Sequence, residues 1–246
     1  MGFDVNVLGT GSSGNSIMID DSIMIDAGLG YRTLKDYGAR ADAIMISHQH
    51  GDHVNMSFVR RMIDSRPVFM RNKFFINEST RQHIRNKLSA EYSSAVDLIV
   101  PIDDESSFDI TAKSGRTYHV ETYRLVHDVE NQGFIITNDA GEKLIHATDT
   151  ETMRFAPRAK YDTLLVEGNW DEDKFIEMIE SEDRNENMRA LRNLRHLSVQ
   201  SFETFVRNNS HAESHILQLH ESMELGSTSL IGADFETIDA LKKLKK

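Results

Sequence analysis

Cysteine is absent from the 246 residues of this chain, and its absence excludes two kinds of chemistry. Neither a disulfide bond nor a thiolate-bound metal ion can form without it. The opening sequence MGFDVNVLG also lacks the apolar stretch of a signal peptide. Both features are typical of proteins that stay in the cytoplasm, and we expect a cytoplasmic location.

Long hydrophobic runs and excess positive charge are also missing. No apolar stretch approaches the roughly 18 residues that a membrane-spanning helix needs, so we expect no membrane partner. The formal net charge of −11 argues against a broad electrostatic attachment to nucleic acid, but not against a local basic groove. Because there are only three prolines and no low-complexity linker, we expect one continuous domain over residues 1–246.

The order of the predicted elements indicates an α/β protein with two sheets packed together and helices outside. Strands are predicted over residues 5–8, 17–20, 23–26, 43–46, 68–70, 108–112, 118–126, 134–137, 143–147, 161–167, 216–219 and 230–231. Helices are predicted over residues 56–65, 77–88, 172–181, 187–195 and 199–208, and from residue 235 onward.

The stretch VLGTGSSGNS, residues 7–16, has the spacing G-x-G-x-x-G of a dinucleotide-binding loop. That fingerprint requires a helix to begin at its last glycine. The sequence IMIDDSIMID that follows shows two apolar quartets around a polar pair, which predicts a β-hairpin. We therefore interpret the glycines as a turn into this hairpin, with backbone amides that approach a substrate as the alternative.

Metal-competent side chains follow the predicted strand at residues 43–46. The sequence SHQHGDH places His48, His50, Asp52 and His53 within six residues, and Gly51 permits the tight backbone between them. Imidazole and carboxylate groups of this kind suit zinc, manganese or iron. The motif predicts a metal site, and a surface loop with three chance histidines is the weaker explanation.

The motif H-x-H-x-D-H after a strand resembles the signature of the metallo-β-lactamase superfamily. The resemblance extends over almost the whole chain. It implies a four-layer αββα fold, with two mixed sheets face to face and helices outside. It also implies that Asp26, in the sequence IDAG, supports the histidine loop through hydrogen bonds.

The same resemblance implies two divalent transition-metal ions, with zinc favoured over manganese or iron. One ion would be held by His48, His50, His127 and Asp149, and the other by Asp52, His53, Asp149 and His220. A water or hydroxide between the ions would be the nucleophile, and Asp52 would also be catalytic. For His220, the alternative is an ordinary histidine at the end of a strand.

Two further residues favour phosphodiesters as substrates. Glu167 ends the sequence LLVE and His196 lies in RHLS, and both resemble elements of the phosphodiesterase branch of the superfamily. In that branch the glutamate orients the histidine, which donates a proton to the leaving group. An alkoxide leaving phosphorus needs such a proton, and histidine titrates in the right range. A surface or helix-cap histidine is the alternative for His196.

Within the branch, the chain is similar to YycJ/WalJ-type exonucleases, tRNase Z-like enzymes and phage anti-Pycsar phosphodiesterases. It departs from the YycJ type at Trp170 and Arg195, where that type has a histidine and a glycine, and after His220, which the expected Leu-Ser does not follow. These departures leave the subfamily open.

The resemblance therefore implies a metal-dependent phosphodiesterase with a nucleotide as its substrate partner. A compact, acidic chain without a long tRNA-gripping arm slightly favours a cyclic mononucleotide over a nucleic-acid end. A phage-encoded counter-defence enzyme would then act in the host cytoplasm. A glyoxalase II-like thioesterase and a non-catalytic binding module are the remaining alternatives, and a homodimer is left open.

Overall fold

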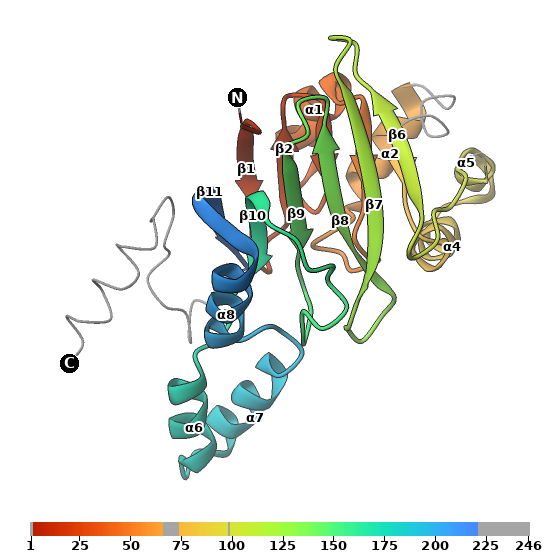
Figure 1. Cartoon of the computed structure of the whole chain (residues 1–246). Coiled ribbons are helices and arrows are strands. Elements are labelled where there is room, and N and C mark those ends of the chain that lie inside the picture. Colours follow the sequence, from red (N-terminus) through yellow and green to blue (C-terminus); the bar gives the residue numbers. More distant parts are fainter. Residues whose placement is uncertain (1, 66–73, 98, 221–246) are drawn as a thin grey trace.

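In the computed structural model, which describes residues 2–65, 74–97 and 99–220, the strands form two sheets that lie face to face (Figure 1). The first sheet has the order β1 (Val5–Gly9), β2 (Ser16–Ile19), β3 (Ile23–Ile25), β4 (Ala43–Met45) and β5 (Phe74–Phe75). The second has the order β11 (Ser210–Leu219), β10 (Tyr161–Glu167), β9 (Lys143–Ala147), β8 (Asn131–Asn138), β7 (Thr117–Leu125) and β6 (Ser107–Thr111). Each sheet contains antiparallel and parallel pairs.

Strand β3 shows how the layers are built. Ile23 and Ile25 pack in the core between the two sheets, whereas Met24 packs against the helices on the outer side. All three residues of this strand are buried because both faces of the sheet are covered. Successive side chains of the strand therefore point alternately into two separate hydrophobic cores.

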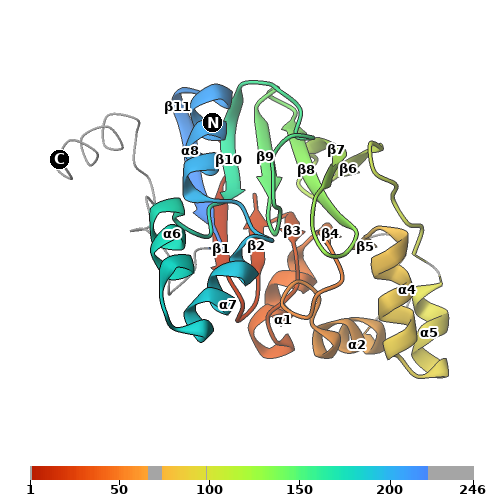
Figure 2. The ribbon, with the colours of Figure 1, turned by 90° about the horizontal axis from the view of Figure 1, so that it is seen from below.

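Helices cover both outer faces. The first sheet is covered by α1 (Tyr31–Arg40), α2 (Met56–Ser65), α4 (Glu78–Lys87) and α5 (Ala90–Val96). The second sheet is covered by α8 (Val199–Asn209). Helices α6 (Glu172–Glu180) and α7 (Arg184–Asn193) form a pair below α8, which Figure 2 shows from below. The predicted αββα arrangement of two mixed sheets is confirmed.

Several predicted elements are found with their expected bounds. Helix α2 covers the predicted residues, and β2 and β3 pair antiparallel as the predicted hairpin, with Ile17 opposite Ile25. Asn77, the first residue of the helix predicted over residues 77–88, caps α4, since its side chain accepts a hydrogen bond from the Thr80 amide at 2.8 Å. The strands predicted at 68–70 and 230–231 and the helix from residue 235 lie outside the described residues.

The sequence prediction missed α1 and α5 and started β11 too late. Helix α1 buries only Leu34 and Gly38, so few apolar residues mark its buried face. Gly38 has a packing reason, because a Cβ there would lie 2.7 Å from the Phe58 ring. Strand β11 begins at Ser210 rather than residue 216, and its polar first half pairs irregularly with β10.

The directions of four strands bring their carboxyl ends to one edge of the second sheet. Strand β7 runs in the same direction as β9 because both pair antiparallel with β8. Strands β10 and β11 are parallel to β9. The carboxyl ends of these four strands therefore meet at one edge, where side chains from distant parts of the sequence can converge.

Candidate metal centre

The histidine loop after β4 is held by the buried carboxylate of Asp26. Its Oδ1 accepts a hydrogen bond from the Ser47 amide at 2.7 Å, and its Oδ2 accepts one from Ser47 Oγ at 2.9 Å. The same Oδ2 lies 2.7 Å from His53 Nδ1. The hydrogen bonds expected of Asp26 are therefore present, and they leave His53 Nε2 to face the cluster.

The glycine stretch lies directly beside this loop. Gly14 N donates to Gly11 O at 3.0 Å, which closes the predicted turn. The next residue, Asn15, donates its backbone amide to Asp52 O at 2.6 Å and lies 2.9 Å from His53 Nε2 through its side-chain Nδ2. A Cβ at Gly28 would lie 1.6 Å from Asp52 O, so this close packing requires glycine. The glycine turn thus stabilises the histidine loop through the contacts of Asn15 and Gly28.

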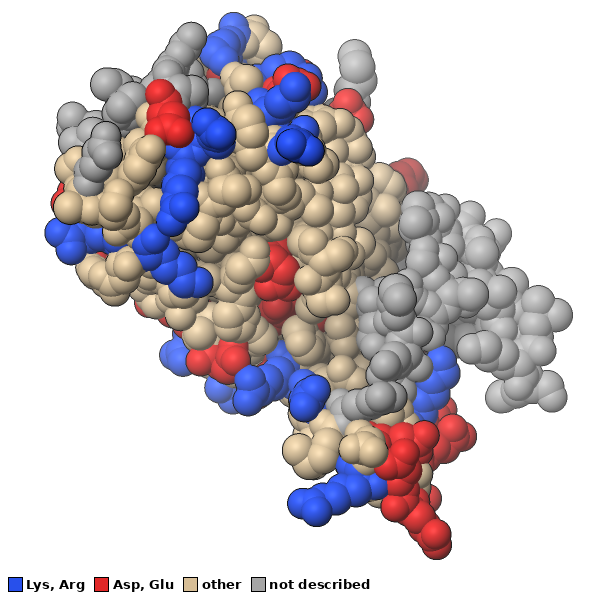
Figure 3. Space-filling model, turned by 180° about the vertical axis from the view of Figure 1, so that it is seen from behind, with Lys and Arg blue, Asp and Glu red and all other residues tan. Residues whose placement is uncertain are grey.

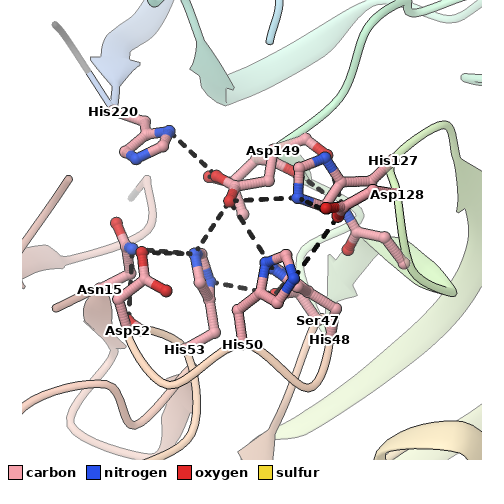
Figure 4. A network of polar contacts seen from close by, with 12 residues as sticks. Asn15, Ser47, His48, His50, Asp52, His53, His127, Asp128, Asp149 and His220 are labelled. Atoms are coloured by element: carbon pink, nitrogen blue, oxygen red, sulfur yellow. Dashed lines mark hydrogen bonds and ion pairs between the residues drawn. The ribbon is translucent and has the colours of Figure 1, made fainter. Parts of the chain in front are cut away.

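Four of the predicted ligand residues converge around one point (Figure 4). Ligand atoms of His48, His50, His127 and Asp149 all lie within 4.8 Å of one another. His48 Nε2 lies 3.6 Å from Asp149 Oδ2, and His127 Nε2 lies 3.7 Å from the same oxygen. These residues come from the ends of β4, β7 and β9, so the sheet architecture assembles the predicted first ligand set.

The second predicted ligand set is assembled only in part. Asp52, His53 and Asp149 form a group within 4.8 Å, with His53 Nε2 at 3.3 Å from Asp149 Oδ2. His220 instead groups with Asp149, Glu167 and His196. Its Nδ1 lies 3.0 Å from Asp149 Oδ1 and 2.9 Å from Glu167 Oε1. Asp149 joins both sets, as its predicted bridging position requires.

The shared position of His220 has a structural cause. Glu167 ends β10 opposite Leu219 of the parallel strand β11, so the residue after Leu219 reaches the same carboxylate. The sequence had linked Glu167 with His196 alone. Backbone strain marks this region, because Asp149 and His220 adopt φ angles of 51° and 52° in the left-handed region.

Glu167 and His196 form the predicted contact. Glu167 Oε1 lies 2.6 Å from His196 Nδ1, and Glu167 Oε2 accepts a hydrogen bond from the Thr150 amide at 2.8 Å. Burial lowers the pKa of His196, but the hydrogen bond to Glu167 and the negative charges of Glu167 and Asp149 together outweigh burial and raise this pKa above its ordinary value. The His196 side chain is 19% exposed and lines the pocket over the cluster.

Electrostatics differ among the clustered histidines. Burial, and then the neighbouring His53, lower the pKa of His48, which favours the neutral imidazole that binds metal. Burial likewise lowers the pKa of His127. Burial also lowers the pKa of His220, but hydrogen bonds to Asp149 and Glu167 prevail and raise it to about 10.

The donor set fits divalent metal ions. Both ring nitrogens of His127 are buried without a hydrogen-bond partner among the described residues. Unsatisfied buried nitrogens are costly unless another group satisfies them, and a bound metal ion would satisfy one of the two. Three imidazoles and one carboxylate around a point match the ligands that zinc takes, and manganese and iron also accept them.

An open pocket of about 880 Å³ lies over the cluster. One side is formed by the turn residues Thr10 to Ser13 and another by Arg192 to His196 at the end of α7. Asp128 projects between them, with Oδ1 at 3.4 Å from His50 Nε2 and Oδ2 at 2.7 Å from Arg195 Nη1. Sequence analysis missed Asn15, Asp128 and Arg192, although Asp128 directly follows a predicted ligand.

Two mixed sheets with a His/Asp cluster at one edge define a protein of the metallo-β-lactamase fold. The chain belongs to the β-lactamase superfamily, because the model of the beta-lactamase superfamily domain matches residues 21–202. The superfamily and the cluster together imply bound divalent metal ions.

Curated relatives and solved structures agree with this family. The chain is 29% identical over 157 residues to the exodeoxyribonuclease WalJ of Streptococcus pneumoniae. The match covers 57% of this chain and 55% of WalJ. The chain thus matches about half the length of this curated relative. The relatives of the chain therefore include hydrolases.

Two solved structures share the fold at low sequence identity. The human tRNase Z short form has a TM-score of 0.58 at 16% identity and covers 89% of this chain and 93% of its own. YhfI from Bacillus subtilis has a TM-score of 0.59 at 13% identity, and the match covers 98% of this chain and 91% of YhfI. Among the helices of the described residues, none is long and apolar enough to cross a membrane.

Proposed function

We propose that this chain is a metal-dependent phosphodiesterase that hydrolyses a nucleotide phosphodiester. The observation that carries the proposal is the 2.6 Å contact between Glu167 Oε1 and His196 Nδ1 beside the His/Asp cluster. A positioned histidine with a raised pKa suits an alkoxide leaving group, which must take up a proton as it departs.

The residues of the site have three roles: they bind the metal ions, support the histidine loop and protonate the leaving group. One ion would be held by His48, His50, His127 and Asp149. The other would be held by Asp52, His53 and Asp149, with His220 as the fourth ligand. When bound, the ions supply Lewis acidity at the phosphate and make a water acidic enough to attack near neutral pH. Asp26 and Asn15 keep the loop in place through His53 and Asp52.

His196 acts on the leaving group. Its Nδ1 faces Glu167, so Nε2 is the nitrogen that can donate to the substrate. As the phosphorus–oxygen bond breaks, the Nε2 proton passes to the leaving oxygen, and the electron pair of the bond goes with that oxygen. Glu167 stabilises the imidazolium beforehand and fixes the plane of the ring.

We propose the end of a nucleic-acid strand as the leading substrate. The match to WalJ, named as an exodeoxyribonuclease, supports this choice. The arginines at the pocket rim, Arg192 and Arg195, support it too, because they can neutralise phosphates beyond the one that is cleaved. This choice reverses the slight preference for a cyclic nucleotide that the sequence had favoured.

A 3′,5′-cyclic mononucleotide is the second candidate. The net charge of −11 favours it, since most of the surface repels a long polyanion. A thioester is a weaker candidate because a thiolate leaves without a proton and would not need His196.

A substrate panel tests the proposal. The metal-loaded protein would be given 5′-phosphorylated single-stranded DNA, cyclic mononucleotides and a glutathione thioester, each with and without a chelator. We expect chelator-sensitive release of mononucleotides from DNA. Cleavage of cyclic nucleotides alone would select the second candidate. Thioester hydrolysis alone, or activity that survives complete metal removal, would overturn the phosphodiesterase proposal.

A further inference from the structure

A groove of about 710 Å³ lies on the outer side of the first sheet, between α1, α2 and α5. Its described lining includes the start of α1, one side of α2 and a tyrosine of α5: Gly30, Tyr31, Arg32, Ser57, Arg60, Arg61, Asp64 and Tyr92. Figure 3, seen from behind, shows a line of Lys and Arg side chains on this face of the molecule. The metal centre does not use any of these residues.

The charge of the groove is opposite to that of the whole chain. Three arginines line it against a single described carboxylate, whereas the chain carries a net charge of −11. Arg61 pairs with Asp64 only at 3.8 Å, and both side chains are well exposed, so this pair is weak. Arg60 donates to Lys87 O at 3.5 Å, and no described carboxylate pairs with Arg32 or Arg60.

The groove begins close to the metal centre. Gly28 packs against the backbone of Asp52, and the Asn55 side chain donates to Gly28 O at 3.4 Å. Gly30 and Ser57 of the groove each follow one of these residues by two positions. Two residues span at most about 7 Å, so Gly30 of the groove lies within about 7 Å of Gly28, which contacts the Asp52 backbone.

We propose that this groove binds a single strand of nucleic acid that extends from the metal centre. The proposal rests on the nucleotide phosphodiesterase function and names the part of the substrate that the pocket does not hold. Arg32 and Arg60 would contact phosphates, and the partly buried rings of Tyr31 and Tyr92 would offer flat surfaces for bases. A basic groove with aromatic rings is the usual way to bind a single strand without sequence preference.

The test compares two double variants with the same change of charge. Arg32→Glu/Arg60→Glu removes the groove arginines, and Arg158→Glu/Arg207→Glu changes two exposed arginines elsewhere. Substrates are a 5′-phosphorylated single strand of about 30 nucleotides, a dinucleotide, and bis-p-nitrophenyl phosphate. Thermal denaturation checks that each variant folds.

We expect the groove variant to raise KM for the long strand about tenfold over the control variant, because two phosphate contacts are lost. The salt dependence of log K for the long strand should become shallower by about 1.4, or about 0.7 for each contact. Rates on the dinucleotide and on bis-p-nitrophenyl phosphate should stay unchanged, since the metal centre is untouched. Fluorescence anisotropy with a labelled strand and protein that has been treated with a chelator measures binding without catalysis.

Equal effects of the two variants on the long strand would overturn the groove proposal. Equal or tighter binding of duplex DNA would also overturn it, since the site would then not select a single strand. If the wild-type protein cleaves cyclic nucleotides but neither binds nor cleaves DNA, the groove proposal fails and the phosphodiesterase proposal stands. If no phosphodiester is cleaved, the proposed function fails, and anisotropy still decides about the groove.

Discussion

Glu167 accepts hydrogen bonds from two histidines through one oxygen, with Oε1 at 2.6 Å from His196 Nδ1 and 2.9 Å from His220 Nδ1. Burial raises the pKa of this carboxyl, but the hydrogen bonds of both histidines lower it below its ordinary value. One buried carboxylate therefore positions both the proposed proton donor and the last predicted metal ligand.

The first prediction concerns His196. We expect His196→Ala to retain both metal ions, because this residue is not a predicted ligand, and to slow phosphodiester hydrolysis by about a hundredfold or more. The loss should shrink on bis-p-nitrophenyl phosphate, whose phenolate leaves without a proton. Equal losses on both kinds of substrate, measured as kcat, would show that His196 does not act as a proton donor.

Glu167→Gln should have two effects. The amide cannot stabilise an imidazolium as a carboxylate does, so we expect a lower kcat with the same leaving-group dependence as His196→Ala, but a smaller loss. Because His220 contacts the same oxygen, we also expect weaker binding of one of the two ions. Metal titration with the apoprotein measures this, and unchanged affinity for both ions would argue against the shared role.

Metal content can be measured directly. The protein isolated without chelator should contain close to two transition-metal ions per chain by elemental analysis. His50→Ala should abolish activity with little change in fold, because the loss of a ligand removes positioning and charge from the centre. Full activity of this variant would contradict the proposed ligand set.

Asp26 provides a test of stability. Asp26→Asn keeps the volume but loses acceptor capacity for Ser47 Oγ or His53 Nδ1, both of which lie in the interior. We expect a loss of about 1–3 kcal/mol in the free energy of unfolding of the apoprotein, measured by denaturant titration. Asp109→Asn, which touches the exposed His119, serves as the control and should change stability by about 0.5 kcal/mol or less.

The buried His146 predicts a pH dependence. Burial lowers its pKa from 6.5 to about 4. Below pH 6.5 the unfolded chain takes up a proton that the folded chain refuses, so stability falls as the pH falls from 6.5 toward 4. The total effect is about 3 kcal/mol.

His146→Leu should flatten this part of the stability curve of the chelator-treated protein, measured by denaturant titration between these pH values. The exposed His215→Leu is the matched control and should retain the full slope. If His146→Leu retains the same slope as the wild type, the loss of stability in acid arises elsewhere.

The sequence by itself was sufficient to predict those elements and motifs whose deciding interactions are local. The motif from His48 to His53 lies within six residues, so its side chains are close in any compact loop. Helix α2 and the hairpin of β2 and β3 follow from apolar periods that are complete within a few turns or pairs. Family resemblance supplied the more distant residues His127, Asp149 and His220.

Tertiary structure decided what depends on strand order and register. Only the parallel pairing of β10 with β11 brings His220 to Glu167, and only packing of the turn against the histidine loop brings Asn15 to His53. The Arg195–Asp128 pair and the arginine groove likewise join elements far apart in the chain, one of them α1, which the sequence prediction missed. The reason is physical: sequence periodicity reports which face of an element is buried, whereas the partner on that face is chosen by how all the elements pack together.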